Sequence, residues 1–249
     1  SAKELRVVPI AGDVARAFVK KHHYSGKVAN NSSLHFGVFL NARLHGVMQF
    51  GPPLDKSRLI GLVSGTKWGD MLELNRMAFD DELPRNSESR AISVALRLIR
   101  KRYPSIEWIV SFADGTQCGD GAIYRASGFV LTAVRPNTTL MKMPDGSVIA
   151  NTTLNTRVMP DGRSAMSHAR ENGAVPLSGY QLRYLFFLNP LARDRLTCSI
   201  LPFSEIDRAG ARMYKGIRGE NNSPGGTTTG EGGVTPTSPL HSEKVTDHA

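Results

Sequence analysis

Four side chains in the first half of the sequence have types and positions suited to acid–base chemistry. Asp114 ends the apolar run SIEWIVSFAD, and a carboxylate at the end of a buried strand can act as a general base. His23 and Tyr24 follow a helical segment and can hold or transfer a proton. Arg76 lies inside the strand-like run ELNRMAF, where an unpaired charge is costly, so it should meet Glu73, Asp114 or a ligand phosphate.

Each of these residues also has an ordinary structural interpretation. Asp114 could cap an Asx-type turn that leads into GTQCGDG. His22 and His23 end a helix, where the dipole favours a protonated imidazole. Consecutive helical residues diverge by about 100°, so only one of these two histidines should face a cleft. Arg76 could form a structural ion pair.

A further segment, DDELPRNSESRAIS, suits an anion better than a proton. The helix that begins near Ser87 offers unpaired N–H groups and the positive end of its dipole, and small residues let an anion approach the backbone. The two arginines can add charge-assisted hydrogen bonds. An ordinary capped helix with solvated arginines is the alternative. The candidate phosphate-binding residues are Arg85, Asn86, Ser87, Ser89, Arg90 and Ala91.

Other reactive side chains are better explained by structural roles. Cys118 lies in a glycine-rich loop without a visible neighbouring base, and most free cysteines are inert. Asp120 directly precedes a short helix and fits an N-cap. His35 and His45 fall within a predicted hairpin, and we interpret both as structural. Paired histidines and acidic residues make a redox metal such as iron conceivable, but no ligand spacing is diagnostic.

The charge of the chain favours a polyanionic partner. Its 249 residues carry a formal net charge of +9, and such a field concentrates polyanions at the surface. Nucleic acid is the leading candidate, and an anionic cofactor could use part of the charge. Phosphate contacts would set the affinity for duplex DNA. We expect those contacts, from loops that flank a cleft, to involve Lys20, Lys21, Lys27, Lys56, Arg58 and Lys67.

Those basic residues could instead form a solvated surface, and Trp68 could be either a wedge that replaces a flipped base or a buried aromatic. Cys118 and Cys198 lie far apart, which indicates neither a zinc knuckle nor a disulfide scaffold. The N-terminal segment lacks the apolar core of a signal peptide, and no apolar stretch approaches the roughly 20 residues of a membrane span. We therefore expect a cytoplasmic protein that does not enter the membrane.

The elements that must position these residues follow from hydrophobic periodicity. The pattern predicts a long loop at 51–70 and a helix at 11–24 whose buried face includes Val14, Ala17 and Phe18. It predicts a second helix from Ser87 to Arg102 and a short helix stopped by Gly128. Strands are expected at 5–10, 71–79, 105–114 and 130–134, with a hairpin over 33–51.

The later third of the chain is β-prone. MPDG occurs at 143–146 and again at 159–162 between such runs, which predicts successive hairpins. YQLRYLFFL and RLTCSILPF are predicted strands. From about Gly216 the composition turns to Gly, Thr, Ser, Pro and Asn, which cannot offset the entropy of ordering. We therefore expect one catalytic domain over 1–215 and a disordered tail over 216–249.

The order of these elements resembles the GNAT acyltransferase fold: strand, helix, hairpin, strand, phosphate-type loop, helix, parallel strand and a short helix ending YRASGF. NSESRA is similar to the pyrophosphate loop of that fold, with Ser89 at its first glycine position, and Tyr124 matches a tyrosine of its late motif. The resemblance implies an α/β fold in which helices flank a mixed central sheet, here with extra C-terminal hairpins. It also implies a donor such as acetyl-CoA or a related CoA thioester.

A narrower resemblance, to the Mom DNA-modification proteins of Mu-like bacteriophages, is carried by four segments: KKHHYSGK, LELNRMAFDDELPRNSESRAIS, SFADGTQCGDGAIYRASGF and RYLFFLNPLARDRLTCSILPF. It implies conversion of adenine N6 in double-stranded DNA to an acetamido-type adduct, which protects the DNA from restriction in the bacterial host cytoplasm. Asp114 would accept a hydrogen bond from N6, and Tyr24 would stack on the flipped base or hold a proton.

The implied chemistry is demanding. Adenine N6 is a poor nucleophile and is paired inside the duplex, so the base must be flipped into a cavity at a cost of a few kcal/mol. An acetamido adduct joins nitrogen to the former methyl carbon, which ordinary acyl transfer cannot achieve, so a further activating step or another donor is required. Two alternatives stay open: a conventional GNAT N-acetyltransferase acting on a small amine or protein, and a noncatalytic DNA-binding protein.

Overall fold

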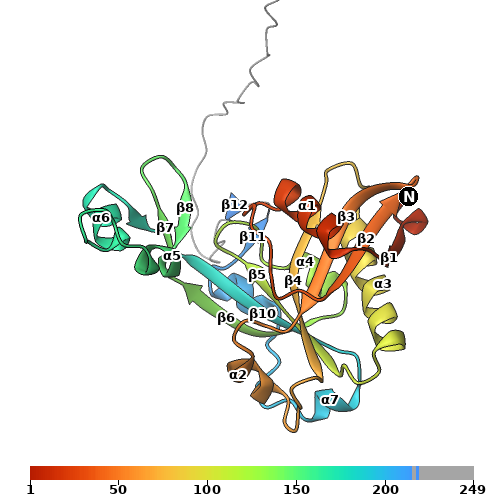
Figure 1. Ribbon diagram of the computed structural model, residues 1–249. Coiled ribbons are helices and arrows are strands. Elements are labelled where there is room, and N and C mark those ends of the chain that lie inside the picture. The colour runs from red at the N-terminus through yellow and green to blue at the C-terminus, as the bar shows by residue number, and fades with distance from the viewer. Residues whose placement is uncertain (215–216, 219–249) are drawn as a thin grey trace, which may run out of the picture. The chain divides into compact units, whose positions relative to one another are not determined.

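A seven-stranded sheet, in the order β1-β2-β3-β4-β5-β10-β6, organises the computed structural model, which describes residues 1–214 and 217–218 (Figure 1). All neighbouring strands are antiparallel except β4 and β5, which are parallel. The strands are β1 (Arg6–Pro9), β2 (Leu34–Leu40), β3 (Arg43–Gly51), β4 (Met71–Phe79), β5 (Trp108–Asp114), β6 (Val130–Asn137) and β10 (Gly179–Phe187).

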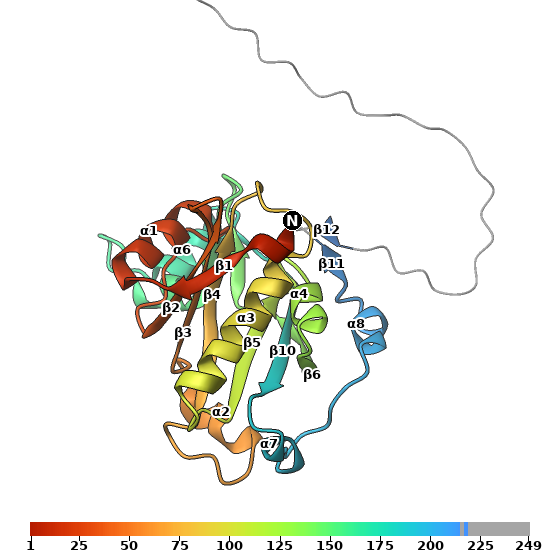
Figure 2. The same ribbon diagram turned by 90° about the vertical axis from the view of Figure 1, so that its right-hand side faces the viewer.

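Helices cover both faces of this sheet. Helix α1 (Gly12–His22) packs on Val47 of β3, whereas α3 (Ser87–Arg102) belongs to the cluster that contains the next residue, Met48. Since successive strand residues point to opposite faces, α1 and α3 lie on opposite sides. Figure 2 shows α3 running along the strands. The shorter helices are η1 (Ala2–Glu4), α2 (Lys56–Leu59), η2 (Ile60–Leu62), α4 (Ala122–Ala126), α7 (Leu191–Asp194) and α8 (Ser204–Arg208).

The two long helices differ in how well their buried faces were predicted. The apolar face predicted for α3 (Ala91, Val94, Ala95 and Leu98) is confirmed, because the two alanines are fully buried and Val94 and Leu98 pack partly buried against the same core. The predicted face of α1 is correct only for Phe18, which packs partly buried against the cluster that contains Ala15 and Val19, whereas Val14 is 44% exposed and Ala17 is also exposed. The segment AGDVARAFVKK has two overlapping sets of apolar residues, and only packing against β3 and β4 selects one of them.

Strands β4 and β5 separate soon after they meet. Their parallel pairing joins Met71–Glu73 to Trp108–Val110 and extends no further within the described residues. Beyond it, the Ser111 hydroxyl donates to the Leu74 carbonyl at 3.4 Å, so one side chain bridges the opening. The backbone groups and side chains that follow Glu73 and Val110 are therefore available to line a cavity.

An insertion between β6 and β10 forms a small unit beside the sheet. It contains β7 (Leu140–Lys142), β8 (Val148–Ala150), α5 (Asn151–Thr156), α6 (Ala165–Glu171) and β9 (Val175–Pro176), and it extends past the ends of β6 and β10 (Figure 1). Its own core includes Met141, Leu154 and Met166. The predicted hairpin around 143–146 is confirmed. The hairpin predicted around 159–162 is wrong, because only an isolated bridge, Val158 to Ser164, flanks that turn before α6 begins.

The segment after β10 is less regular than expected. RLTCSILPF, predicted as a strand, runs without strand structure apart from the single bridges of Leu196 to Val63 and Leu201 to Leu131. Short strands β11 (Met213–Tyr214) and β12 (Ile217–Arg218) pair with each other. Strand pairing therefore passes the predicted domain boundary at residue 215. The rest of the predicted disordered tail lies outside the described residues.

The predicted fold class is confirmed. The structure is a mixed α/β arrangement in which helices flank a central sheet, and its elements follow the order on which the resemblance to the GNAT fold rests. Among the described residues, no helix is both long and apolar enough to span a membrane.

Candidate functional site

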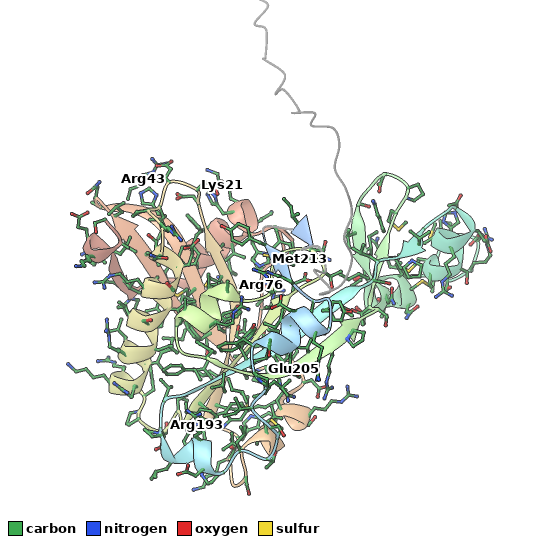
Figure 3. All side chains as sticks on the ribbon, turned by 180° about the vertical axis from the view of Figure 1, so that it is seen from behind. Lys21, Arg43, Arg76, Arg193, Glu205 and Met213 are labelled. Carbon is green, nitrogen blue, oxygen red and sulfur yellow. The ribbon has the colours of Figure 1, made fainter. Side chains whose placement is uncertain are left out.

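A cavity of about 480 Å³ opens where β4 and β5 separate. Figure 3 shows Arg76, one of its lining residues, between Lys21 near one end of the sheet and Arg193 near the other. Its walls come from the segment after α1, from the separated strands β4 and β5 with the turn after β5, from β10, and from the base of the insertion. The lining residues used below are His23, Tyr24, Lys27, Glu73, Asn75, Arg76, Asp114, Gln117, Asn137, Leu140, Val148, Ala150 and Gln181.

Asp114 caps the turn that its sequence position allows and also accepts a hydrogen bond at the cavity. Its Oδ1 accepts the backbone N–H groups of Thr116 at 2.9 Å and Gln117 at 3.3 Å, which forms the turn after β5. Its Oδ2 accepts the Tyr24 hydroxyl at 2.9 Å. Burial of that hydroxyl, followed by the charge of Asp114, raises the pKa of Tyr24. The phenol therefore keeps its proton and is a hydrogen-bond donor to the carboxylate.

His23, and not His22, lines the cavity. His22 stacks on Phe18, with ring centroids 4.3 Å apart, whereas the His23 ring stacks on Tyr24 at 4.4 Å. The Nδ1 atom of His23 accepts the N–H of Ser25 at 3.2 Å. Burial and then the charge of Arg76 lower the pKa of His23 to about 4. At neutral pH the ring is uncharged, and since Nδ1 accepts, Nε2 carries the hydrogen.

Arg76 is the cation of the cavity, but it does not pair with a carboxylate. Its Nε donates to the Lys27 carbonyl at 3.2 Å and one terminal nitrogen donates to the Asn75 carbonyl at 2.7 Å. Within the described residues it makes no ion pair with Glu73 or Asp114, and the third expected partner, a ligand phosphate, stays a prediction. The two carbonyls hold the guanidinium and leave its charge uncompensated.

Glu73 is a cavity residue that the sequence indicated only as a partner for Arg76. Burial raises the pKa of its carboxyl to about 7, although Arg76 and a hydrogen bond with Asn75 lower it in part. It occupies the last position of β4 that pairs with β5. A carboxyl that titrates near neutrality beside an uncompensated arginine is suited to proton transfer.

The first turn of α3 has the features expected of an anion site. Asn86 precedes the helix with a left-handed backbone, φ 69°, and no side chain caps the helix N-terminus. Ser87 is buried and donates to the Pro84 carbonyl, and Ser89 donates to the Asn86 carbonyl at 3.2 Å. Within the described residues, the backbone N–H groups of Glu88 and Ser89 have no acceptor.

The side chains around this turn differ in accessibility. Arg85 is exposed, whereas Ala91 is fully buried in the core. Arg90 donates to the Lys3 carbonyl at 3.3 Å, and its Nε is buried without a partner in the described part of the chain. The Ser127 hydroxyl of α4 donates to the Ser89 carbonyl at 3.2 Å, which places the start of α3 beside the helix that follows the Asp114 turn.

Tyr124 lies in the core and is not on the cavity wall. It packs on Phe129 and Tyr184 with ring centroids 5.4 and 5.3 Å away, and it is 7% exposed. Burial raises its pKa to about 12, and its hydroxyl interacts with Ser111, the residue that bridges β4 and β5. A cofactor role for Tyr124 stays a prediction, and it would require the core to open.

The predicted DNA-contacting residues divide into two separate groups. Lys20, Lys21 and Lys27 are exposed on and just after the last turn of α1, beside the cavity. The loop that carries Arg58 and Lys67 packs at the start of β5 instead. Asp114 is at the other end of this seven-residue strand, and a rise of about 3.3 Å per residue separates the two ends by roughly 20 Å. The expectation that this loop flanks the cavity is therefore wrong.

Lys56 and Trp68 depart furthest from expectation in that loop. Lys56 is 5% exposed, its Nζ lies 4.4 Å from the centre of the Trp68 ring, and burial lowers its pKa. It is not available to DNA as it stands. Trp68 is 65% exposed, so its interpretation as a buried aromatic is wrong. Arg58 is exposed and pairs with Asp55 at 3.1 Å.

The residues interpreted as structural largely keep that role. His45 is buried and its Nδ1 lies 2.9 Å from an Asp80 oxygen; the Nδ1 of His35 lies 3.2 Å from the Gln49 amide nitrogen. Asp120 is not the predicted N-cap, because Gly121 precedes α4; it pairs with Arg125 at 3.0 Å.

Neither a thiol nucleophile nor a metal centre is indicated at the cavity. Desolvation and the charge of Asp114 raise the pKa of Cys118, which disfavours its nucleophilic thiolate form. No group of three or more His, Cys, Asp and Glu side chains among the described residues is arranged to hold a metal ion.

Comparisons with known proteins identify relatives over most of the chain. The model of the Mom protein family matches residues 4–205. The methylcarbamoylase mom of Escherichia phage Mu is 41% identical over 200 residues, which cover 80% of this chain and 82% of that protein.

Solved structures give only distant similarities. A Bacillus subtilis acetyltransferase in complex with CoA is 10% identical, with 74% of this chain and 98% of that chain covered and a TM-score of 0.44. The ribosomal-protein-S18-alanine N-acetyltransferase of Escherichia coli is 12% identical, with 74% and 94% covered and a TM-score of 0.41.

Proposed function

This chain belongs to the Mom protein family, and from that premise we propose that it transfers a carbamoylmethyl group to the exocyclic N6 of adenine in duplex DNA. The observation that carries the proposal is the hydrogen bond between Tyr24 and Asp114 at a cavity between separated parallel strands. The name of the phage Mu relative, methylcarbamoylase, supports the group that is transferred. The modification would protect phage DNA from restriction.

The cavity can accommodate a base taken out of the duplex. Its volume of about 480 Å³ is within the usual range for sites that bind small organic ligands. Tyr24 is 53% exposed at this site and can stack on a flipped base, while Lys27 stands at the wall for phosphate contacts. Flipping costs a few kcal/mol, which phosphate contacts beside the cavity would offset.

Asp114 is the proposed acceptor for the N6 proton. Its Oδ1 is committed to the turn, so Oδ2 is the oxygen that would face the amine in exchange for the Tyr24 hydroxyl. A hydrogen bond from N6–H to a carboxylate raises electron density on a nitrogen that otherwise delocalises its lone pair into the ring. Tyr24 keeps its own proton, so its role is to stack or to donate a hydrogen bond.

His23, Arg76 and Glu73 surround the reacting amine with complementary charge. Neutral His23 offers its Nε2–H and Arg76 offers a positive charge, and both can stabilise negative charge that develops on an oxygen of the transferred group. Glu73, with its pKa raised to about 7, can receive or return a proton at neutral pH.

The start of α3 is the proposed site for the phosphates of a CoA-type donor. The free N–H groups of Glu88 and Ser89 fit such an anion, and Arg85 is exposed beside them. A CoA thioester would supply an activated two-carbon acyl unit. Acyl transfer alone forms a bond at the carbonyl carbon. The carbamoylmethyl product has its bond at the former methyl carbon and carries an amide nitrogen, so it requires in addition a two-electron oxidant and a nitrogen donor. A redox metal such as iron stays a prediction, without a ligand set among the described residues.

Nucleoside analysis tests the function directly. DNA from bacterial cells that express this chain, digested to nucleosides, should contain an adenine derivative whose fragmentation places CH2–CO–NH2 on N6. An N6 amide at the carbonyl carbon would indicate the alternative of a conventional N-acetyltransferase. Unmodified DNA together with normal duplex affinity would indicate the alternative of a noncatalytic DNA-binding protein.

Calorimetry with acetyl-CoA tests the donor site separately. Ser89→Asp places a carboxylate where the pyrophosphate is expected, so binding should weaken strongly because like charges repel at the helix N-terminus. Ser93→Ala, one turn further along α3, is the matched control and should bind as the wild type does. Equal affinity in the Ser89→Asp variant would remove the donor from this site.

A further inference from the structure

Four carboxamide side chains line the cavity. Asn75 is buried on β4, where its Oδ1 accepts the Ser32 hydroxyl at 3.1 Å. The other three, Gln117, Asn137 and Gln181, lie near Asp114. Amides of this kind are the side chains that commonly recognise adenine, because they offer a donor and an acceptor side by side. Which of the three is free to do so depends on the hydrogen bonds that each already makes.

Asn137 is committed to the protein. Its Nδ2 donates to the Thr116 hydroxyl at 3.1 Å, and its Oδ1 accepts both the N–H of Thr139 at 3.1 Å and the Thr139 hydroxyl at 2.7 Å. These bonds join the base of the insertion to the turn after β5. The Asn137 amide is therefore part of the wall and is not available to a ligand.

Gln117 is partly committed. Its Nε2 lies 3.4 Å from the Asp114 Oδ2, the same oxygen that accepts the Tyr24 hydroxyl. Gln117 lies on the turn that Asp114 itself caps. The side chain thus orients the carboxylate, and its amide nitrogen is occupied while it does so.

Gln181 differs from Asn137 and Gln117 in its hydrogen bonds and in its position. Its amide has no hydrogen-bond partner within residues 1–214, and it lies on β10, directly opposite Asp114 in the antiparallel pairing of β10 with β5. Paired strand residues have Cβ atoms about 5 Å apart, which is within reach of two adjacent atoms of one base. A strand with neighbours on both sides also holds a side chain more firmly than a loop does.

We propose that Gln181 reads the edge of the flipped base together with Asp114, an inference that rests on the proposed function. Asp114 Oδ2 accepts one N6–H, Gln181 Oε1 accepts the other, and Gln181 Nε2 donates to the ring nitrogen on its own side of the amino group, N1 or N7. Both oxygens then face the amino group and the amide N–H faces a ring acceptor.

This arrangement selects amino bases against keto bases. Guanine and thymine present a carbonyl oxygen where adenine presents N6–H, so that oxygen would face two acceptors, Asp114 Oδ2 and Gln181 Oε1. Cytosine shares the amino pattern of adenine, and hydrogen bonding alone does not exclude it. Leu140, Val148 and Ala150 of the insertion also line the cavity and offer apolar contact, which the larger purine ring can use more fully.

The test removes one hydrogen-bonding group at a time from each partner. Gln181→Met keeps the length of the side chain without the amide, and duplexes carrying 1-deazaadenine or 7-deazaadenine at the target lack one ring acceptor each. In the wild type, one of these analogues should lower kcat/KM about 5- to 150-fold, the range for losing one good base contact. In Gln181→Met, adenine should react as slowly as that analogue, and the analogue should cause no further loss.

Asn155→Ala is the matched control, because it removes an amide from α5 of the insertion at a position that does not line the cavity. Its discrimination between adenine and the analogues should equal that of the wild type. If Gln181→Met retains wild-type discrimination while the wild type modifies N6 normally, the inference is overturned and the proposed function stands. If the wild type modifies no nucleoside, the proposed function fails and this inference fails with it.

Discussion

The two ends of β5 have opposite characters. At its start, Trp108 is fully buried and its Nε1 donates to the Thr66 hydroxyl at 3.0 Å, while the neighbouring Glu107 pairs with Arg195 at 2.5 Å. At its end, β4 has moved away, and Asp114 and the uncompensated Arg76 line an open cavity. One end satisfies its polar groups internally, whereas the other leaves them available to a ligand.

The difference indicates how a strand of seven residues can be both rigid and reactive. The apolar cluster around Trp108, with Leu59, Leu62 and Met71, stabilises the parallel pairing at one end. Because that end is closely packed, the other can keep a buried carboxyl of raised pKa, Glu73, without unfolding. Substitutions at the cavity end should therefore affect activity, and substitutions at the packed end should affect stability.

Asp114→Asn should have the largest effect on activity. The amide oxygen can still accept the turn N–H groups of Thr116 and Gln117, but it cannot take the N6 proton. The modification rate should fall about 10²- to 10⁴-fold, the usual contribution of a general base, with an unchanged circular dichroism spectrum. Cys118→Ala, in the same loop, should modify DNA at the wild-type rate. Near-normal modification by Asp114→Asn would leave Asp114 as a turn residue only.

Trp108→Ala should give the largest effect on stability. Removing a fully buried tryptophan costs about 3–5 kcal/mol of unfolding free energy, which chemical denaturation measures. The remaining folded molecules should modify DNA at the normal rate. Trp68→Ala is the matched control: that ring is 65% exposed and only meets the Lys56 ammonium, so the loss should stay below about 1 kcal/mol. Equal losses in both variants would contradict the contrast between the ends.

Glu73→Gln should make the stability of the protein less dependent on pH, because it removes a carboxyl whose ionised form destabilises the folded state. The folded pKa of about 7 lies above the ordinary 4.5, so protonation favours the folded state. Stability from this group is complete below pH 4.5 and is lost as the pH rises to 7. The variant lacks that loss. The difference between its denaturation midpoint and that of the wild type should therefore become more positive from pH 5 to pH 8. A constant difference across that interval would show that Glu73 titrates normally.

Two lysine variants should give the smallest difference between the two ends of β5, measured as affinity for DNA. Lys27 lines the cavity and Lys67 lies at the packed end of β5. If duplex DNA binds over the cavity, Lys27→Gln should lower affinity and reduce the slope of log affinity against log salt by about 1. Lys67→Gln should leave both unchanged in the same titration. A larger effect of Lys67→Gln would move the DNA to the other end of the sheet.

Local sequence patterns predicted most elements of the central sheet and its helices, and they identified Asp114 as a candidate. The apolar periodicity of 87–102 matches α3, and the position of Asp114 after a buried run placed it at a strand end, where Tyr24 reaches it. Such features depend on residues close in sequence or on the general geometry of parallel strands. They could therefore be inferred before any tertiary contact was known.

What the sequence did not indicate depends on distant contacts. Lys56 sits in a loop with prolines and glycines and has the composition of an exposed residue, yet its stem is buried and its ammonium lies over Trp68. Glu73 and Gln181 look like ordinary polar positions in alternating strands. Gln181 becomes a candidate only because β10 lies beside β5, and Glu73 only because β4 and β5 separate directly after it, and no local pattern specifies either relation.

The place of β10 in the sheet also has a consequence for biosynthesis. Within the sheet, β6 pairs only with β10. The edge of β5 that faces away from β4 pairs with the same strand, so it has no partner until β10, which ends at Phe187, has been synthesised. At translation rates of about 5–20 residues per second, that edge stays open for roughly 4 to 15 s after Asp114 is made. During that interval the nascent chain has an unpaired hydrophobic strand edge, which can aggregate, and its cavity is still incomplete. Ribosome-associated chaperones would have to protect this edge.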